Sequence, residues 1–401
     1  MNSRPRIAAI TAVLALLAVF PPIATDMYLA AMGEIAEAFG TTRSGAELSL
    51  SLFFLGLCAG QLVMGPLIDA FGRKGPLLAG VVLFTATSVG LLLTRDIAVF
   101  NTLRFFQAVG ACAGMVVGRA VVSDLYSGRE AAKMMTVLVM LMTLGPILSP
   151  SIGSLLLGAF GWESIFVAMV AVGLAALALA QAVLPETLPR EKRAADPFGA
   201  ARANALRLLG RRAFLFPALV AGLVQGAMFA FITGSSGVFQ GVYGLGATAY
   251  GVLFGLVAAA LVIFGQVNSW LLNRHEPQRI VDAGLPVFVA AAAVLALVSQ
   301  SPALWMVLVP LWIAIGMVGL LSANAMSITM AASGGGAGMG SALLGAIQFA
   351  IAFLVSSSVA LGSGGSALAM ALGILLPGAA ALGLWLAMRR SGVVAADRTA
   401  G

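Results

Sequence analysis

Residues 283–388 contain no Asp, Glu, Lys, Arg or His, and they include the runs AGLPVFVAAAAVLALVSQ (283–300) and LWMVLVPLWIAIGMVGLLSANAMSITM (304–330). A membrane-spanning helix needs about 20 predominantly apolar residues, so this stretch holds about four spans joined by short loops. The whole chain is 61% hydrophobic and 9% charged, whereas soluble domains carry about 25% charged residues. The apolar runs are continuous, without the alternation of β-barrel strands. The sequence therefore predicts an all-α membrane protein.

Twelve apolar segments can be delimited along the chain, and most are joined by short segments rich in Gly, Ser or Pro. The exception is 185–212, a longer segment that carries seven Lys and Arg residues. We interpret it as a basic cytoplasmic linker between two six-helix halves, 1–184 and 213–401, the second ending in a short tail. The expected spans are 7–30, 46–68, 76–94, 98–119, 134–157, 163–184, 213–233, 248–272, 279–299, 303–324, 340–361 and 366–388.

The distribution of basic residues supports this count of spans. With the N-terminus in the cytoplasm, most of the 22 Lys and Arg residues fall in inner segments, and only Arg43 and Arg95 fall in outer loops. Cytoplasmic loops of membrane proteins carry such an excess of basic residues. An even number of spans then places both termini in the cytoplasm. The net charge of +7 has the same explanation, so we expect no nucleic-acid partner.

The loop after the second expected span reads GPLIDAFGRK (65–74). A glycine permits a close helix contact or a sharp turn, and a carboxylate can accept from a basic neighbour or a helix N-terminus. The pattern resembles the signature between helices two and three of the major facilitator superfamily, where it latches the cytoplasmic side of the two halves. An ordinary basic turn would explain the same residue types. The matching positions are Gly65, Asp69, Gly72, Arg73 and Lys74, with Ala70 where the family usually has a basic residue.

Two further spans carry patterns of the same superfamily. The fourth begins LRFFQAVG (103–110), which resembles R-x-x-Q-G-x-G. The fifth contains GPILSPSIG (145–153), which resembles the Gly-Pro-rich antiporter motif of drug exporters. Proline removes a backbone donor, so such a helix can bend or act as a hinge. A kinked helix without a transport role would show the same sequence pattern. The hinge residues are then Gly145, Pro146, Pro150 and Gly153.

Several segments, among them ATDMYL (24–29), GRAVVSDL (118–125) and LPETLP (184–189), resemble the bicyclomycin/chloramphenicol-resistance (Bcr/CflA) branch of the superfamily. The resemblance implies the major facilitator fold and a drug/proton antiporter in a bacterial inner membrane. The expected substrates are small amphipathic antibiotics such as chloramphenicol- or bicyclomycin-like compounds. Export of a natural metabolite such as an amino acid or a sugar is the alternative. We expect a monomer whose partners are its substrate, protons and the lipid bilayer, with the proton gradient as energy source and no cofactor.

Burying an ionisable group inside a membrane costs free energy, so such a group is kept for function or is paired with another polar group. Asp26 lies eight residues before Glu34, and Arg104 lies eight residues after Asp96, which places both about 12 Å below the outer side at 1.5 Å per residue. A change in their separation or hydration would change the proton affinity of Asp26. The pair therefore indicates proton coupling, with a static ion pair between helices as the alternative.

The remaining candidate residues are polar or aromatic positions on other spans. Arg119 lies within reach of Asp124 at the inner end of the fourth span, where the two could form a relay or gate, or Arg119 could simply snorkel. A tentative substrate cavity collects side chains that could equally serve helix packing. Its members are Tyr28, Gln225, Phe229, Asn324 and Gln348.

An enzymatic function is not expected from this sequence. The sole histidine, His275, falls in an inner loop, and no cluster with metal-ligand spacing occurs in the sequence. The chain also lacks the Gly-Lys-Ser/Thr loop of nucleotide-driven pumps. Secondary active transport remains as the predicted function.

Overall fold

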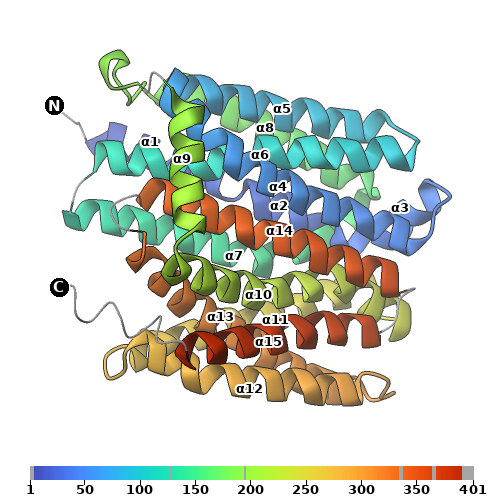
Figure 1. The fold of residues 1–401 in the computed structure, drawn as a ribbon. Coiled ribbons are helices and arrows are strands. Elements are labelled where there is room, and N and C mark those ends of the chain that lie inside the picture. The colour runs from blue at the N-terminus through green and yellow to red at the C-terminus, as the bar shows by residue number, and fades with distance from the viewer. Residues whose placement is uncertain (1–3, 127, 194–195, 334–336, 364–366, 391–401) are drawn as a thin grey trace. The chain divides into compact units, whose positions relative to one another are not determined.

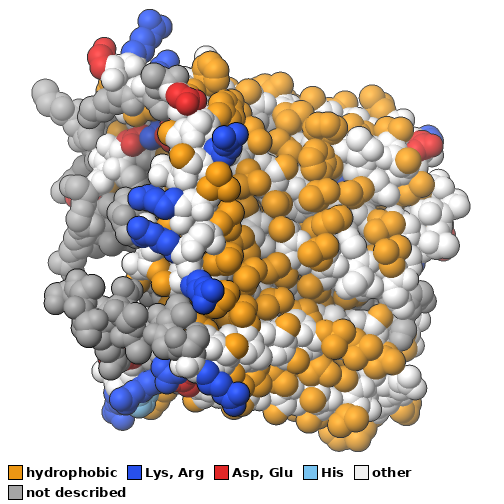
Figure 2. Space-filling view, in the orientation of Figure 1, with side chains coloured by type: hydrophobic (Ala, Val, Ile, Leu, Met, Phe, Trp, Pro, Cys, Tyr) orange, Lys and Arg blue, Asp and Glu red, His pale blue; other side chains and the backbone are white. Residues whose placement is uncertain are grey.

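The computed structural model describes residues 4–126, 128–193, 196–333, 337–363 and 367–390. Within these ranges every regular element is helical (Figure 1). The helices form two compact units, Met1–Ala201 and Arg202–Gly401, which are described separately below. In Figure 2 apolar side chains cover the long helices, whereas Lys and Arg side chains gather near helix ends.

The first unit consists of nine α- or 3₁₀-helical segments and a short 3₁₀ turn, η2 (Arg190–Lys192). The nine segments are α1 (Arg4–Ala18), α2 (Phe20–Asp26), η1 (Met27–Ala31), α3 (Met32–Ala38), α4 (Arg43–Phe71), α5 (Lys74–Leu93), α6 (Ile97–Leu125), α7 (Gly128–Phe160) and α8 (Glu163–Val183).

The second unit contains six long helices and a π-helical extension, and it is preceded by a helix within the predicted linker. The linker helix is α9 (Pro197–Leu209), an element that the sequence analysis did not predict. The others are α10 (Arg212–Ser236), η3 (Gly237–Val242), α11 (Ala247–Leu271), α12 (Pro277–Val298), α13 (Leu304–Ala331), α14 (Ala337–Ser363) and α15 (Ala367–Arg390).

The predicted membrane helices are present in the structure. Among the described residues, eleven helical stretches are long and apolar enough to cross a bilayer. The remaining expected span, 134–157, lies within α7, whose described apolar part is the shorter segment Leu144–Phe160. Most helices extend a few residues past the predicted spans, because hydropathy delimits only the part of a helix that lies in hydrocarbon.

The first expected span is present as the stretch Ala9–Ala38, but it is the least regular span and is not one continuous α-helix. The spanning stretch Ala9–Ala38 is divided into α1, α2, η1 and α3, with a change to 3₁₀ geometry directly after Asp26. Pro21 and Pro22 supply no backbone donors, and the hydroxyl of Thr25 donates to the carbonyl of Pro21 at 2.8 Å. Glu34 lies inside α3 rather than in a loop, so Asp26 lies farther from the end of this span than its predicted depth.

Two glycines of the predicted antiporter motif allow α7 to pack closely against this broken span. A Cβ on Gly145 would lie 2.3 Å from the Cβ of Pro22, and a Cβ on Gly153 would lie 1.8 Å from the carbonyl oxygen of Met27. Small residues let helix backbones approach in this way inside membranes. Pro146 and Pro150 are buried within α7, which remains continuous through both of them. In this structure the motif is therefore a packing surface for α2 and η1.

Replacing Gly153 by Ala tests this close approach. The new methyl group would collide with the Met27 carbonyl, and overpacking of this kind costs about 1–3 kcal/mol. We expect Gly153→Ala to lower the thermal unfolding midpoint of the purified protein. The matched control is Gly158→Ala on the same helix, where a Cβ meets no atom within 4 Å. Equal midpoints for the two variants would contradict the packing described.

Candidate functional site

Arg104 lies on α6 in the interior of the first unit, with 0% of its surface exposed. Its Nη2 donates to the carbonyl oxygen of Ala24 at 2.6 Å, and its Nη1 donates to Oε1 of Gln107. The guanidinium carbon lies 4.2 Å from the ring centre of Tyr28 and 4.4 Å from that of Phe53. Two aromatic faces and two acceptors thus replace part of the water that a charged group loses on burial, while Nε of Arg104 has no hydrogen-bond partner within the described residues.

A second set of hydrogen bonds fixes the acceptor that Arg104 uses. The buried Gln107 follows Arg104 by three residues, so both side chains lie on the same face of α6. Its Nε2 donates to Oγ of Ser88 at 2.7 Å, and that hydroxyl donates to the carbonyl of Phe84 at 2.7 Å. The Arg and Gln of the predicted R-x-x-Q pattern therefore act together, with α5 as their support.

Asp26 is 1% exposed and lies at the junction of α2 and η1. Its Oδ1 is buried and has no hydrogen-bond partner, and no ion pair joins it to Arg104 among the described residues. Arg104 binds instead the carbonyl of Ala24, two residues before Asp26. The structure thus brings the two predicted residues to the same break in the first span, without a direct contact between their charges.

The surroundings of this break include residues that the sequence analysis treated differently. Tyr28, expected in the substrate cavity, is fully buried over Arg104, and its hydroxyl shares a 3.0 Å hydrogen bond with Ser49. Glu47 on α4 is also 0% exposed, and the sequence analysis did not select it. It lies one residue inside the apolar segment 46–68, close enough to the end to pass as a loop residue. A carboxylate at the second position of an apolar segment was the available signal that Glu47 could be buried.

Arg73 is the centre of the predicted latch. Its Nη1 donates to Asp69 at 2.7 Å and to the carbonyl of Ile68 at 3.1 Å, and its Nε donates to Asp124 at 3.0 Å. The hydroxyl of Thr187 also donates to Asp124, at 2.7 Å. Asp124 is thus part of the latch. Arg73 and Thr187 both donate to Oδ2 of Asp124, and the predicted relay or gate of Asp124 with Arg119 stays a prediction.

Glu186, which follows α8, adds a carboxylate to the cluster around Arg73. Its carboxylate accepts from the backbone N–H of Arg73 at 2.8 Å and of Lys74 at 3.3 Å, where α5 begins. A carboxylate at this position stabilises the positive end of the helix dipole. Gly72 has φ +90°, and a Cβ there would lie 2.3 Å from Oε2 of Glu186. Glycine is required for both the turn and the approach of the carboxylate.

The other two latch residues have different roles. Nζ of Lys74 donates to the carbonyl of Gln181 near the end of α8, at 2.9 Å. Gly65 makes no close contact within its own unit, since a Cβ there would meet no atom within 4 Å. Glu186 and Thr187 were noted in the sequence only as part of the family resemblance. Their hydrogen bonds join residues 113 positions apart for Glu186 and Arg73 and 63 positions apart for Thr187 and Asp124, which no local pattern encodes.

In the second unit, the predicted cavity residues separate into packing and accessible positions. Asn324 is buried and donates to Oδ1 of Asn268 at 2.6 Å and to the carbonyl of Leu320 at 2.7 Å, so it joins α13 to α11. Phe229 is buried with its ring centre 5.9 Å from that of Phe349. Packing thus accounts for both side chains in this structure.

Gln225 and Gln348 are the half-buried members of the predicted cavity. Gln225 on α10 accepts from the hydroxyl of Ser322 at 3.1 Å, and its Nε2 donates to the sulfur of Met228 at 3.3 Å. Among the described residues, no group of three or more His, Cys, Asp or Glu side chains could hold a metal ion. The half-buried polar side chains Gln225, Gln348 and Ser322 are neutral amides and a hydroxyl.

The charge of Glu186 gives the latch a defined pH dependence. The pKa of this carboxyl is lowered from its ordinary value of 4.5, although burial alone acts to raise it. The groups that outweigh burial are the backbone N–H groups of Leu188, Arg73 and Lys74 and the guanidinium of Arg193. A carboxyl with a depressed pKa in the folded state stabilises the protein above its unfolded pKa, and this contribution is lost as pH falls through the folded value.

We therefore expect Glu186→Gln to lower the thermal unfolding midpoint at pH 7, with the difference from the unmodified protein shrinking as pH falls below the ordinary carboxyl value of 4.5. The matched control is Glu191→Gln, which changes an exposed carboxylate of the same segment. Unfolding midpoints measured from pH 7 down to about pH 3 check the expectation. A deficit of Glu186→Gln that is independent of pH, or equal to that of the control, would contradict it.

Comparison with known proteins places these features in a family. The sequence model of the Major Facilitator Superfamily matches residues 14–358. The chain is 32% identical to an uncharacterized MFS-type transporter, YdgK, of Bacillus subtilis (strain 168), over 88% of both chains. It is 28% identical to a bicyclomycin resistance protein homolog of Haemophilus influenzae, over 86% of this chain and 87% of the relative. It is 32% identical to a chloramphenicol resistance protein of Pseudomonas aeruginosa, over 76% and 71%.

Solved structures agree on the fold. A D-xylose-proton symporter superposes with a TM-score of 0.74 at 16% identity, covering 94% of this chain and 97% of the symporter. A bacterial homolog of the human lysosomal transporter Spinster, in an inward-facing and occupied conformation, gives 0.74 at 14% identity, covering 97% and 98%. The predicted superfamily resemblance is confirmed, and the protein is a transporter rather than an enzyme. The chain belongs to the major facilitator superfamily.

Proposed function

We propose that this transporter is a proton-coupled exporter of small amphipathic antibiotics, a drug/proton antiporter. The observation that carries the proposal is the buried carboxyl of Asp26, placed where the first span breaks and two residues from the carbonyl that Arg104 holds. Relatives named for resistance to bicyclomycin and chloramphenicol, at 28% and 32% identity, support the substrate class.

The coupling follows from the cost of burying charge. A neutral carboxylic acid is far easier to hold in a dry interior than a carboxylate, so the buried conformation suits protonated Asp26. When the proton leaves, the carboxylate requires water or a cationic partner. Arg104 is the candidate that we select, because its guanidinium is already bound to the same irregular segment. Exchange of Arg104 between the Ala24 carbonyl and the Asp26 carboxylate would thus couple proton release to a change in the shape of the first span.

The substrate side of the proposal rests on the second unit. The half-buried groups there, Gln225, Ser322 and Gln348, are uncharged. A mostly apolar cavity with a few neutral polar groups suits neutral amphipathic molecules. With both termini in the cytoplasm of a bacterium, as the distribution of Lys and Arg predicts, export through the inner membrane would use the inward proton gradient.

Transport by purified protein in liposomes tests the role of Asp26. With an imposed pH gradient, we expect Asp26→Asn to lose gradient-driven movement of radiolabelled chloramphenicol and to retain exchange of labelled for unlabelled drug across the membrane. The physical reason is that an amide cannot release a proton but leaves the shape of the site intact. The matched control is Glu37→Gln, an exposed acid on the same span.

The same experiment separates the alternatives. Unchanged gradient-driven transport by Asp26→Asn would contradict the proposal that Asp26 couples transport to protons. Movement of amino acids or sugars, without movement of any antibiotic in the panel, would favour export of a natural metabolite.

A further inference from the structure

The second unit contains a groove of about 510 Å³ between α11, α12 and α13. Most of its wall is apolar, but His275 and Arg279 contribute cationic or polar groups. The transport proposal uses neither of these residues. The lining side chains that matter below are Leu271, His275, Arg279, Ala283, Val287 and Met317.

The groove exists because α11 and α12 both pack against α13 and make few contacts with each other. Glycines bring both helices close to α13. A Cβ on Gly319 would lie 2.7 Å from the carbonyl oxygen of Leu261 on α11, and one on Gly284 of α12 would lie 2.9 Å from the side chain of Leu321. The space above α13 between the two helices is left open, with Met317 and Leu320 in its wall.

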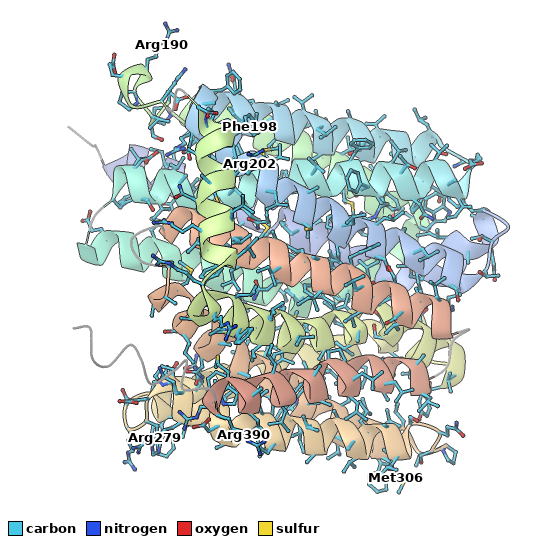
Figure 3. The ribbon with its side chains drawn as sticks, viewed as in Figure 1. Arg190, Phe198, Arg202, Arg279, Met306 and Arg390 are labelled. Carbon is cyan, nitrogen blue, oxygen red and sulfur yellow. The ribbon has the colours of Figure 1, made fainter. Side chains whose placement is uncertain are left out.

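The groove has one polar end and one apolar end. Arg279, Ala283 and Val287 are spaced by four residues on one face of α12, so this wall runs for about 12 Å along the helix. Arg279 lies in the first turn of α12, and His275 lies in the turn that precedes it. In Figure 3, Arg279 lies at the same end of the helices as Arg390, and Met306 lies at the opposite end.

The groove opens on a surface that suits lipid. Val287 is 51% exposed, and the exposed side chains farther along α11 and α12, such as Val267 and Val294, are apolar as well. In a chain that spans a bilayer, such side chains lie against hydrocarbon. At the polar end the guanidinium of Arg274 lies 5.1 Å from the ring centre of Trp270, and tryptophan is typical of the membrane–water interface.

The charge of Arg279 is available to a ligand. The acid that follows it by three residues, Asp282, is bound by Arg389 at 2.9 Å and by the indole N–H of Trp385 at 2.7 Å. No ion pair of Arg279 occurs within the described residues of this unit. The one other acid nearby is Glu276, in the same turn, and the basic residues Arg274 and His275 precede it.

We propose that this groove binds an anionic phospholipid. The phosphate lies against Arg279 and His275, and one acyl chain follows Ala283 and Val287 over Met317. A soluble anion would leave the apolar length of the groove empty. A zwitterionic lipid would bring its own cation close to Arg279 and Arg274. Basic recesses between membrane helices are known to recognise anionic headgroups. The bound lipid fills the gap between α11 and α12 and stabilises their packing on α13.

Native mass spectrometry of the full-length protein, with dioleoylphosphatidylglycerol or dioleoylphosphatidylcholine added to the detergent, tests the site. We expect preferential retention of phosphatidylglycerol. Arg279→Gln should weaken its binding about fivefold, because a basic residue near an anionic headgroup contributes about 1 kcal/mol. The matched control is Arg212→Gln, an exposed cation of the same unit outside the groove, with no expected effect.

A second variant tests the apolar part without changing charge. Ala283 is exposed, so Ala283→Phe fills the groove while leaving the core unchanged, and it should also reduce retention of phosphatidylglycerol. Thermal unfolding in lipid-free detergent shows that each variant is folded, and His275→Gln replaces Arg279→Gln if the latter is not. Equal retention of the two lipids, equal binding by Arg279→Gln and Arg212→Gln, or unchanged binding by Ala283→Phe would overturn the proposal.

Discussion

The guanidinium of Arg104 has no access to water, and the arrangement of the first unit depends on how its hydrogen bonds are supplied. A charge in the middle of a membrane protein costs about 2.5–3.5 kcal/mol on insertion scales unless it is compensated. Here compensation comes from a backbone carbonyl at Ala24, the amide of Gln107 and the faces of two aromatic rings. The irregular first span and the buried arginine are therefore parts of one arrangement, because breaks in a membrane helix are tolerated where neighbouring groups satisfy the backbone.

The same helix carries both clusters of the first unit. Arg104 lies in the N-terminal half of α6, and Asp124 lies near its C-terminal end, where it binds Arg73 and Thr187. Glu186 adds a carboxylate to the start of α5 in that second cluster. A movement of α6 relative to the first span would change the contacts of Arg104 and the latch together. On the proposed coupling through Asp26, such a movement would connect the protonation of Asp26 with the contacts of Asp124 at the C-terminal end of α6.

The sequence predicted the membrane helices and the superfamily, because hydropathy and short motifs are local properties, and it offered Arg73 as one of two possible donors to Asp69. It also predicted that Asp26 and Arg104 belong to one region. It could not predict that Arg104 binds a carbonyl rather than a carboxylate, since that depends on the break after Asp26. The sequence placed Arg119 within reach of Asp124 but did not predict the contact of Asp124 with Arg73, because packing of α4 against α6 brings those two residues together. Glu47 was missed because its burial is a tertiary property.

Proton release on substrate binding is the most direct test of the central claim that the Asp26 carboxyl exchanges its proton as the protein binds drug. Purified protein in weakly buffered detergent, with a pH-sensitive dye, would be mixed with chloramphenicol or bicyclomycin. The account predicts that the unmodified protein and Glu37→Gln release protons, and that Asp26→Asn binds the drug without release. Equal proton release from Asp26→Asn would contradict it.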